Sequence, residues 1–184
     1  MSGTGPGTRG AVALRPAVPA DVPALAALHV AVWRETYAGL APAGILAQID
    51  LPRRVAQWEA VLAAAEHGSG VVLAEAGGAL AGFVSWGAPR HGPLRGAREI
   101  HTLYVAAGHR RAGLGRRLLS FAFDAIRQAG PLAIGLAVLD GNAAARRAYA
   151  ALGGREIDVV TDPGPLWRSR DVIVLWDADT PLRA

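Results

Sequence analysis

The sequence predicts a mixed α/β domain in which helices cover both faces of a central, mostly antiparallel seven-stranded sheet. The order of elements supports this fold class: a strand, two helices, three strands, a helix, a strand, a helix and two strands follow one another. The pair Gly77-Gly78 indicates a hairpin, because two glycines between apolar runs favour a tight antiparallel turn. At 184 residues the chain suits one domain, expected at 11–184 after a flexible tail at 1–10.

The first half of the chain combines two helices with the hairpin. A short strand is expected at 11–15, and Asp21 is the expected N-cap of the first helix. That helix places on one face Leu25, Leu28, His29, Val32 and Trp33. A second helix is expected at 52–66, and the hairpin strands are expected at 70–75 and 79–86.

The second half alternates helices and strands. The segment 87–97 is rich in proline and glycine, so we expect a mobile loop there. A strand is expected at 98–105, where apolar and polar residues alternate, and another at 132–139, where the run is almost wholly apolar. The remaining expected elements are a helix at 113–129, a shorter helix capped by Asn142, and an antiparallel pair at 155–160 and 171–177.

The composition excludes several classes of site. The chain has no cysteine, which rules out disulfides, zinc–thiolate sites and a thiol nucleophile. It has no lysine either, so a Walker phosphate loop is absent. Five scattered histidines form no recognisable metal motif, and no metal is expected. No apolar run approaches the ~18 residues of a membrane span, so we expect a soluble, cytoplasmic protein without a membrane partner.

The segment HRRAGLGRR at 109–117 is the most distinctive part of the chain. It places four arginines around Gly113 and Gly115, where a helix is expected to begin. Positive side chains are unfavourable there, since a helix N-terminus already carries positive partial charge. No acidic residue lies between Glu99 and Asp124 to neutralise them along the chain. Free N–H groups, arginines and two residues without side chains together predict a pyrophosphate-binding turn.

Two motifs carry a family resemblance. The segment EIHTLYVAAGHRRAGLGRRLL resembles the signature of the GCN5-related N-acetyltransferases, with the phosphate-binding turn at Arg110-Arg111-Ala112-Gly113-Leu114-Gly115. The segment NAAARRAYAALGG, which begins at Asn142 and contains Ala145 and Tyr149, is similar to the second family motif. The resemblance covers about residues 12–177 and implies the acyl-CoA N-acyltransferase fold.

The resemblance also implies a cofactor and its place. Acetyl-CoA would be the acyl donor and would lie between two splayed strands, one ending at Val105 and the other preceding Asn142. Backbone groups near Leu103 would hold the pantetheine arm and polarise the thioester carbonyl. The expected cofactor-binding residues are Leu103, Tyr104, Val105, Arg110, Arg111, Ala112, Gly113, Leu114, Gly115, Arg116, Asn142 and Tyr149.

The implied reaction is direct attack of a neutral amine on the thioester. It needs a group that takes a proton from the ammonium and a group that protects or protonates the departing thiolate. Glu99 stands where several family members carry a catalytic glutamate, and Tyr149 is the second catalytic candidate. His101 shares the strand face of Glu99, so either could act, directly or through water. The alternative roles are an ion pair of Glu99 with an arginine, a packing role for His101 and a core position for Tyr149.

The acceptor is expected to be a primary amine of a small molecule or a peptide. Trp33, Tyr37 and Trp86 could line its pocket, because aromatic faces attract ammonium groups, but packing in the core is an equal alternative. His101 is the fourth candidate. Ala137 stands five residues before the motif asparagine, where family members that acetylate protein N-termini often have an acidic residue, which counts against a ribosomal-protein substrate. A homodimer is left open.

Two other functions remain as alternatives. A net charge of +4, a sequence pI near 10.6 and the outward pair Arg146 and Arg147 are compatible with an arginine-rich nucleic-acid-binding protein. Interleaved aromatic residues are missing, however, so no nucleic-acid partner is expected. A catalytically silent acyl-CoA-binding domain would need only the phosphate-binding turn.

Overall fold

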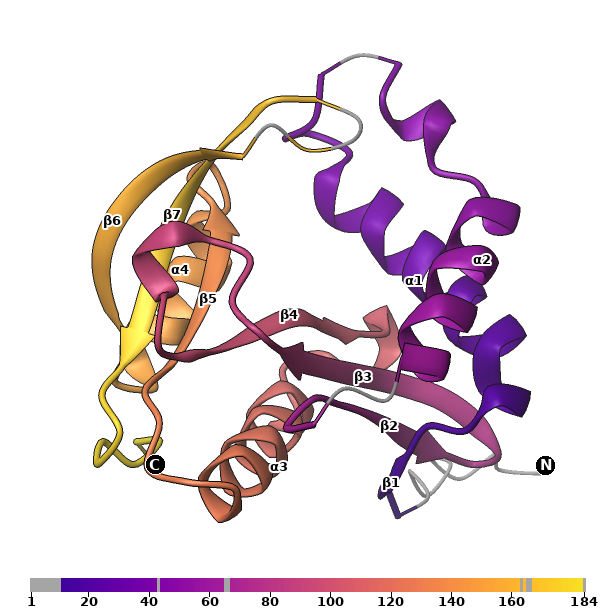
Figure 1. The fold of residues 1–184 in the computed structure, drawn as a ribbon. Helices are drawn as coiled ribbons and strands as arrows, with labels where there is room; N and C mark the ends of the chain where they lie inside the picture. Colours follow the sequence, from indigo (N-terminus) through magenta and orange to yellow (C-terminus); the bar gives the residue numbers. More distant parts are fainter. Residues whose placement is uncertain (1–10, 43, 65–66, 163, 165–166, 184) are drawn as a thin grey trace, which may run out of the picture.

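The computed structural model describes residues 11–42, 44–64, 67–162, 164 and 167–183. The expected tail at 1–10 lies outside these residues, as do Ala65 and Glu66 at the end of the second expected helix. Figure 1 shows helices on both faces of one twisted sheet, which confirms the predicted fold class. Within the described part of the chain, no helix is both long enough and apolar enough to cross a membrane.

The sheet contains all seven predicted strands. They are β1 (Ala13–Pro16), β2 (Gly70–Ala76), β3 (Ala79–Gly87), β4 (Arg98–Val105), β5 (Ile134–Leu139), β6 (Arg155–Asp162) and β7 (Ser169–Trp176). Their order is β1-β2-β3-β4-β5-β7-β6, and every neighbouring pair is antiparallel except β4 and β5. The turn between β2 and β3 has positive φ angles of 58° at Gly77 and 80° at Gly78, which the two-glycine hairpin requires.

Four helices divide between the two faces. They are α1 (Val22–Tyr37), α2 (Leu51–Ala64), α3 (Leu114–Gln128) and α4 (Ala143–Ala151). Side chains alternate along a strand, so Val71 and Leu73 of β2 pack with α1 and α2, whereas Val72 and Ala74 pack with α3. Tyr149 of α4 packs against the core cluster that contains the α3 side chains, so α4 lies on the α3 side of the sheet.

The parallel pair in the middle of the sheet is short. Residues Arg98–Ile100 of β4 pair with Ile134–Leu136 of β5. Beyond them β4 runs on to Val105 and β5 to Leu139 without further pairing between the two strands. The strands therefore open toward their carboxyl ends, which lead into α3 and α4, a favoured position for ligand binding.

Two local features differ from what the sequence suggests. Asp21 is the N-cap residue of α1, as predicted, but its carboxylate makes no capping hydrogen bond to that helix; it accepts the Val18 N–H at 2.8 Å and pairs with Arg15 at 2.7 Å. The proline- and glycine-rich loop before β4 is anchored rather than loose, because Leu94 is 0% exposed and packs against Ile173 of β7. The burial of one leucine thus fixes this loop over β5 and β7.

Candidate active site

A groove of about 480 Å³ opens where β4 and β5 diverge, and we call it the splay groove. Eight of the expected cofactor-binding residues line it: Leu103, Tyr104, Val105, Arg110, Gly115, Arg116, Asn142 and Tyr149. Leu114 instead turns its side chain into the core, where it is 3% exposed. Two motifs that are separate in the sequence therefore meet at one groove.

The bend before α3 has a backbone suited to an anion. Arg111 has a φ of 57° and is, within the described residues, the only non-glycine residue with a positive φ. This conformation costs roughly 1–2 kcal/mol for a residue with a side chain. Gly113 follows with a φ of 78°, which glycine adopts readily. The N–H groups of Leu114, Gly115 and Arg116 lie in the first turn of α3, so they have no acceptor within the helix.

The arginines around this bend differ in their partners. Arg110 pairs with Glu35 of α1 at 2.7 Å, and its Nε donates to the Val105 carbonyl at 3.0 Å. Glu35 lies 75 residues before Arg110 and reaches it only in the folded chain, so one of the four arginines is neutralised by a residue that is distant in the sequence. Arg116 is exposed, and no carboxylate of a described residue lies within ion-pair distance of it. It is the arginine of the splay groove that a phosphate could bind.

Gly115 has no intramolecular reason to be glycine. It belongs to α3 and has no positive φ. A Cβ placed there would meet only the Val105 Cγ2 atom at 3.7 Å, an ordinary contact. Alanine also favours helices more than glycine does. The missing side chain instead leaves the first-turn N–H groups open to the splay groove.

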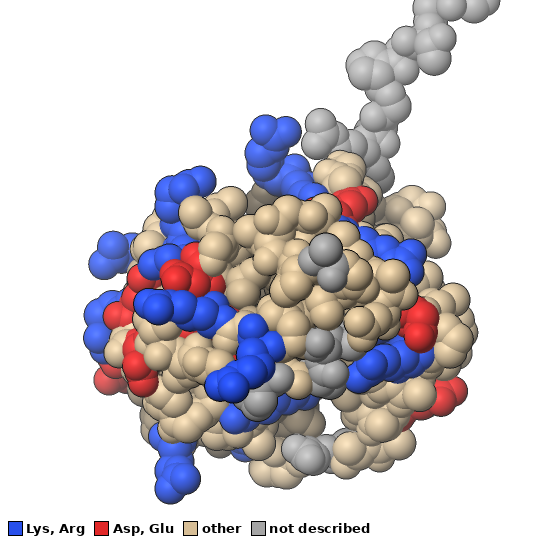
Figure 2. Space-filling view, turned by 90° about the horizontal axis from the view of Figure 1, so that it is seen from above, with Lys and Arg blue, Asp and Glu red and all other residues tan. Residues whose placement is uncertain are grey.

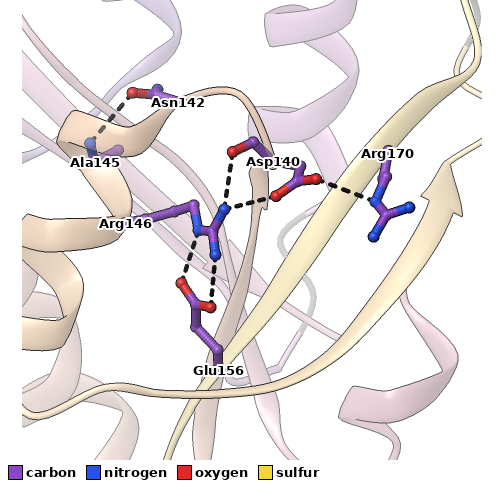
Figure 3. A network of polar contacts seen from close by, with 6 residues as sticks. All are labelled: Asp140, Asn142, Ala145, Arg146, Glu156 and Arg170. Atoms are coloured by element: carbon purple, nitrogen blue, oxygen red, sulfur yellow. Dashed lines mark hydrogen bonds and ion pairs between the residues drawn. The ribbon is translucent and has the colours of Figure 1, made fainter.

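An ion-pair network holds the start of α4 (Figure 3). The Asn142 side chain accepts a hydrogen bond from the Ala145 N–H at 3.2 Å, which confirms the predicted cap. Arg146 bridges Asp140 at 2.6 Å and Glu156 at 2.7 Å, as Figure 3 shows. These contacts tie α4 to the end of β5 and to β6, and so keep Asn142 at the splay groove.

Tyr149 lies on the groove side of α4. Its ring packs edge-on against Trp176 of β7, with ring centroids 6.1 Å apart. Burial raises the pKa of Tyr149, so the hydroxyl stays protonated at neutral pH. The side chain can therefore donate a proton or a hydrogen bond into the groove.

Glu99 is bound to a histidine rather than to an arginine. It is 2% exposed, and its Oε1 lies 2.8 Å from the Nδ1 of His91. Its Oε2 accepts the N–H groups of Arg90 at 2.6 Å and His91 at 3.2 Å. Burial acts to raise the pKa of Glu99, but the hydrogen bonds to its charged form outweigh burial and lower it, and the same pair raises the pKa of His91. The carboxylate is consequently a weak base with both oxygens occupied.

Two further cavities adjoin the splay groove. The α1–β7 cavity, of about 510 Å³, is lined by residues that include Trp33, Tyr37, Arg54, Asp162, Trp167 and Asp171. The His91 cavity, of about 550 Å³, is lined by residues that include His91, Glu99, His101, Asp162 and Asp171. Ala137 of β5 lines both cavities and the splay groove. The three hollows thus meet beside the middle of β5.

Comparison with known proteins identifies the family. Residues 30–153 match the family model described as the Acetyltransferase (GNAT) family. The chain belongs to this family. A segment of 111 residues is 32% identical to the "Probable N-acetyltransferase Rv2775" of Mycobacterium tuberculosis and covers 60% of this chain. It spans 63% of that relative, less than two thirds of its length.

Solved structures share the GNAT fold. The PaiA N-acetyltransferase of Thermoplasma acidophilum, solved in complex with coenzyme A, has a TM-score of 0.73 and 19% identity, over 91% of this chain and 99% of that one. YncA of Salmonella typhimurium, solved with its cofactor acetyl-CoA, has a TM-score of 0.66 and 24% identity, over 92% and 95% of the two chains. At these identities the likeness is one of fold.

The residues predicted to bind the acceptor lie in different places in the structure of this GNAT protein. Trp33 and Tyr37 line the α1–β7 cavity with their ring centroids 4.6 Å apart, and Trp167 lies 5.5 Å from Trp33. Trp86 is 7% exposed and packs in the core with α3, on the same face of β3 as Val84. The prediction of an acceptor role for Trp86 is therefore corrected, because its side chain points to the opposite face of the sheet from α1.

His101 lies at the junction of two hollows of the GNAT site. It lines both the splay groove and the His91 cavity. Its Nε2 lies 2.9 Å from the Ala88 carbonyl oxygen, which can only accept, so Nε2 donates a hydrogen bond to it. This contact holds the imidazole in one orientation where the two hollows meet.

Several residues that line these cavities were not predicted as site residues, among them Arg54, His91, Asp162, Trp167 and Asp171. His91, Arg54 and Trp167 carry no motif that marks them, because a loop histidine, a helix arginine and a loop tryptophan are ordinary in sequence. Asp171 opens the otherwise apolar strand DVIVLW, and a carboxylate at the entrance of a buried strand is the one signal that could have identified it.

Proposed function

We propose that this GNAT protein is an acetyl-CoA-dependent N-acetyltransferase that acetylates a primary amine of a small molecule or a peptide. The observation that carries this proposal is the splay groove. It runs from the first turn of α3 to Ala137, where the α1–β7 cavity with its aromatic wall begins. A donor in the groove and an amine in the cavity would meet at that junction.

The residues present fit a phosphorylated thioester carrier. The first-turn N–H groups of α3, together with Arg116, would bind its diphosphate. The edge of β4 beyond Ile100 has no strand partner on the β5 side, so backbone groups of Leu103 and Val105 would hold the amides of the pantetheine arm. Bound acetyl-CoA would supply an activated acyl group.

The proposed transfer is direct. The amine nitrogen forms a bond to the acetyl carbon as the carbon–sulfur bond breaks, and a backbone N–H of β4 near Leu103 stabilises the developing oxyanion. The Tyr149 hydroxyl would give its proton to the departing thiolate and would regain the proton that the nitrogen loses as the amide forms, directly or through water. One proton must also leave the ammonium before attack.

Glu99 and His101 are the two proposed acceptors for that proton, directly or through water. Glu99 has both oxygens hydrogen-bonded and a lowered pKa, which weakens it as a base. His101 lines the splay groove itself, whereas Glu99 lines only the His91 cavity. The position of His101 therefore favours it as the base, with Glu99 fixing the loop through His91.

The alternative of a nucleic-acid-binding protein depended on unpaired arginines, and some of these arginines are paired in the structure. Arg110 and Arg146, which belong to its two basic segments, are paired with carboxylates. On the face drawn in Figure 2, acidic side chains lie among the basic ones instead of leaving a continuous basic track. A nucleic-acid surface needs an uninterrupted positive stripe.

The test of this proposal combines cofactor binding with turnover. Calorimetry should detect acetyl-CoA binding, and a free-thiol assay over small amines, aminoglycosides, amino acids and peptides should detect acetylation. Gly115→Ala should weaken acetyl-CoA binding at least tenfold without lowering stability, because its Cβ meets no tight contact in the protein. Arg147→Met, on the exposed face of α4, is the control and should bind as the wild type does.

Each outcome has a distinct meaning. Unchanged affinity in Gly115→Ala would place the diphosphate elsewhere. Acetyl-CoA binding without acetylation of any probe would support the silent acyl-CoA-binding alternative. Binding of neither cofactor nor amine would contradict the proposal altogether.

A further inference from the structure

The α1–β7 cavity contains charged groups of both signs that the proposed chemistry does not use. Arg54 lines it from α2, and Asp171 lines it from β7. Each is partly buried and has, among the described residues, fewer partners than its charge requires. A buried charge without a partner indicates a missing ligand group.

Arg54 is a half-buried guanidinium without a carboxylate. Its Nη1 donates to the Gln57 side-chain oxygen, and no carboxylate of a described residue lies within ion-pair distance. Burial lowers the pKa of Arg54, which expresses the cost of holding the charge there. A guanidinium has five N–H donors, so several remain for an anionic group in the cavity.

Asp171 is the opposite case. Its Oδ1 is buried and has no hydrogen-bond partner in the described part of the chain, while its carboxyl group hydrogen-bonds to Ser169. The side-chain oxygens of Asp162 and Asp171 and a ring nitrogen of His91 lie within 4.8 Å of one another. Burial and the Asp162 charge raise the pKa of Asp171. A cation between the two carboxylates would relieve both effects.

Tyr37 lines the same cavity as Arg54 and Asp171. Burial raises the pKa of its hydroxyl, Asp171 raises it further and Arg54 lowers it, so both charges act on this one group. The rings of Trp33 and Trp167 complete an aromatic wall beside it, 5.5 Å apart between centroids. The cavity therefore offers an anion-binding end at Arg54, a cation-binding end at Asp162 and Asp171, and an aromatic surface.

We infer that the acceptor is a small zwitterion, an amine that also carries a carboxylate, as a free amino acid does. Its ammonium would lie against Asp162 and Asp171, and its carboxylate against Arg54. A volume of about 510 Å³ suits a small molecule of this kind. The opening at Ala137 would place the amine beside the splay groove, so this inference rests on the proposed function and names its substrate class.

Binding to the protein saturated with coenzyme A tests the inference without requiring turnover. The probes are the common L-amino acids, their α-amides and the matching decarboxylated amines, titrated calorimetrically. At least one amino acid should bind, and it should bind about 10- to 100-fold more tightly than its amide or amine, because a hydrogen bond to a charged group is worth about 1.5–3 kcal/mol. Equal affinity within each matched set, or no binding of any amino acid, would overturn the inference.

Substitutions test which residue binds the carboxylate of the ligand and which binds its ammonium group. Arg54→Met should abolish the preference for the free carboxylate while leaving the affinity for the decarboxylated amine within about threefold, because only one charge is removed. Asp171→Asn should weaken the binding of amino acids and of decarboxylated amines by similar factors. Arg147→Met, an equal change outside the cavity, should retain the preference. A preference that persists in Arg54→Met would place the carboxylate elsewhere and contradict the assignment.

A metal ion is the competing occupant of the acidic end. Titration with Mn²⁺ in wild type and in Asp171→Asn distinguishes the two. Saturable Mn²⁺ binding that requires Asp171, without zwitterion binding, would overturn the inference in favour of a cation site. If amino acids bind with the predicted preference but none is acetylated, the cavity binds zwitterions as inferred, but they are not acceptors and the proposed catalytic function fails.

Discussion

His29 makes stability depend on pH in a way that can be calculated. This α1 residue is 2% exposed, with its ring 5.7 Å from Trp58 and 5.0 Å from Tyr104. Its Nδ1 accepts the Trp58 indole N–H at 3.2 Å. Protonation would turn that acceptor into a donor facing another donor. Burial, with a contribution from the Arg54 charge, accordingly lowers the pKa of His29 to about 3.

The sign and size follow from proton linkage. The unfolded chain binds a proton at this histidine below a pKa of about 6.5, whereas the folded chain binds it only near 3, so acid favours unfolding. The contribution of the neutral buried ring is complete above pH 6.5 and is lost as pH falls. At pH 5 the protonated form of this imidazole outnumbers the neutral form about 30-fold in the unfolded chain. This preference lowers the free energy of unfolding by about 2 kcal/mol relative to pH 7.5.

The assay compares urea unfolding at pH 7.5 and pH 5 by tryptophan fluorescence. Wild type should lose about 2 kcal/mol more than His29→Gln between the two values, since glutamine does not titrate. The raised pKa of His91 acts in the opposite direction, because its stabilisation is present at low pH, and the comparison with His29→Gln cancels it. His67→Gln, at an exposed position, is the control. An equal loss in wild type and His29→Gln would refute a neutral, buried His29.

Three further predictions concern the site and its support. Tyr149→Phe should lower kcat about 10²- to 10⁴-fold while acetyl-CoA affinity stays within about threefold, measured by steady-state kinetics and calorimetry; an unchanged kcat would remove the hydroxyl from the chemistry. Leu94→Ala should cost about 2–5 kcal/mol in urea unfolding, because a fully buried side chain is removed; a loss under 1 kcal/mol would mean that the loop does not depend on it. Asn142→Ala should cost about 1 kcal/mol through loss of the cap to Ala145, and Asn142→Asp, which keeps an acceptor, should restore most of it.

Much of the fold could be read from local patterns. Alternation of apolar residues over Arg98–Val105 and the two glycines at 77 and 78 define β4 and the β2–β3 hairpin, because strand period and turn geometry are properties of neighbouring residues. The expected boundaries of α3, residues 113–129, differ from the observed Leu114–Gln128 by one residue at each end. The sequence predicts a mobile loop before β4, whereas the structure anchors this loop. The local pattern could not show this, because the burial of Leu94 depends on contact with Ile173, far along the chain.

The site divides in the same way. The sequence alone indicated the glycine-containing bend before α3 and the cap at Asn142, because each belongs to a short motif whose geometry is local, and the family resemblance indicated eight of the residues that line the splay groove. Only the tertiary structure decided that Arg110 pairs with Glu35, that Trp86 lies in the core and that Arg54 and Asp171 line one cavity. These contacts depend on how helices and strands pack against one another, and no spacing along the chain encodes the distance between side chains on different elements.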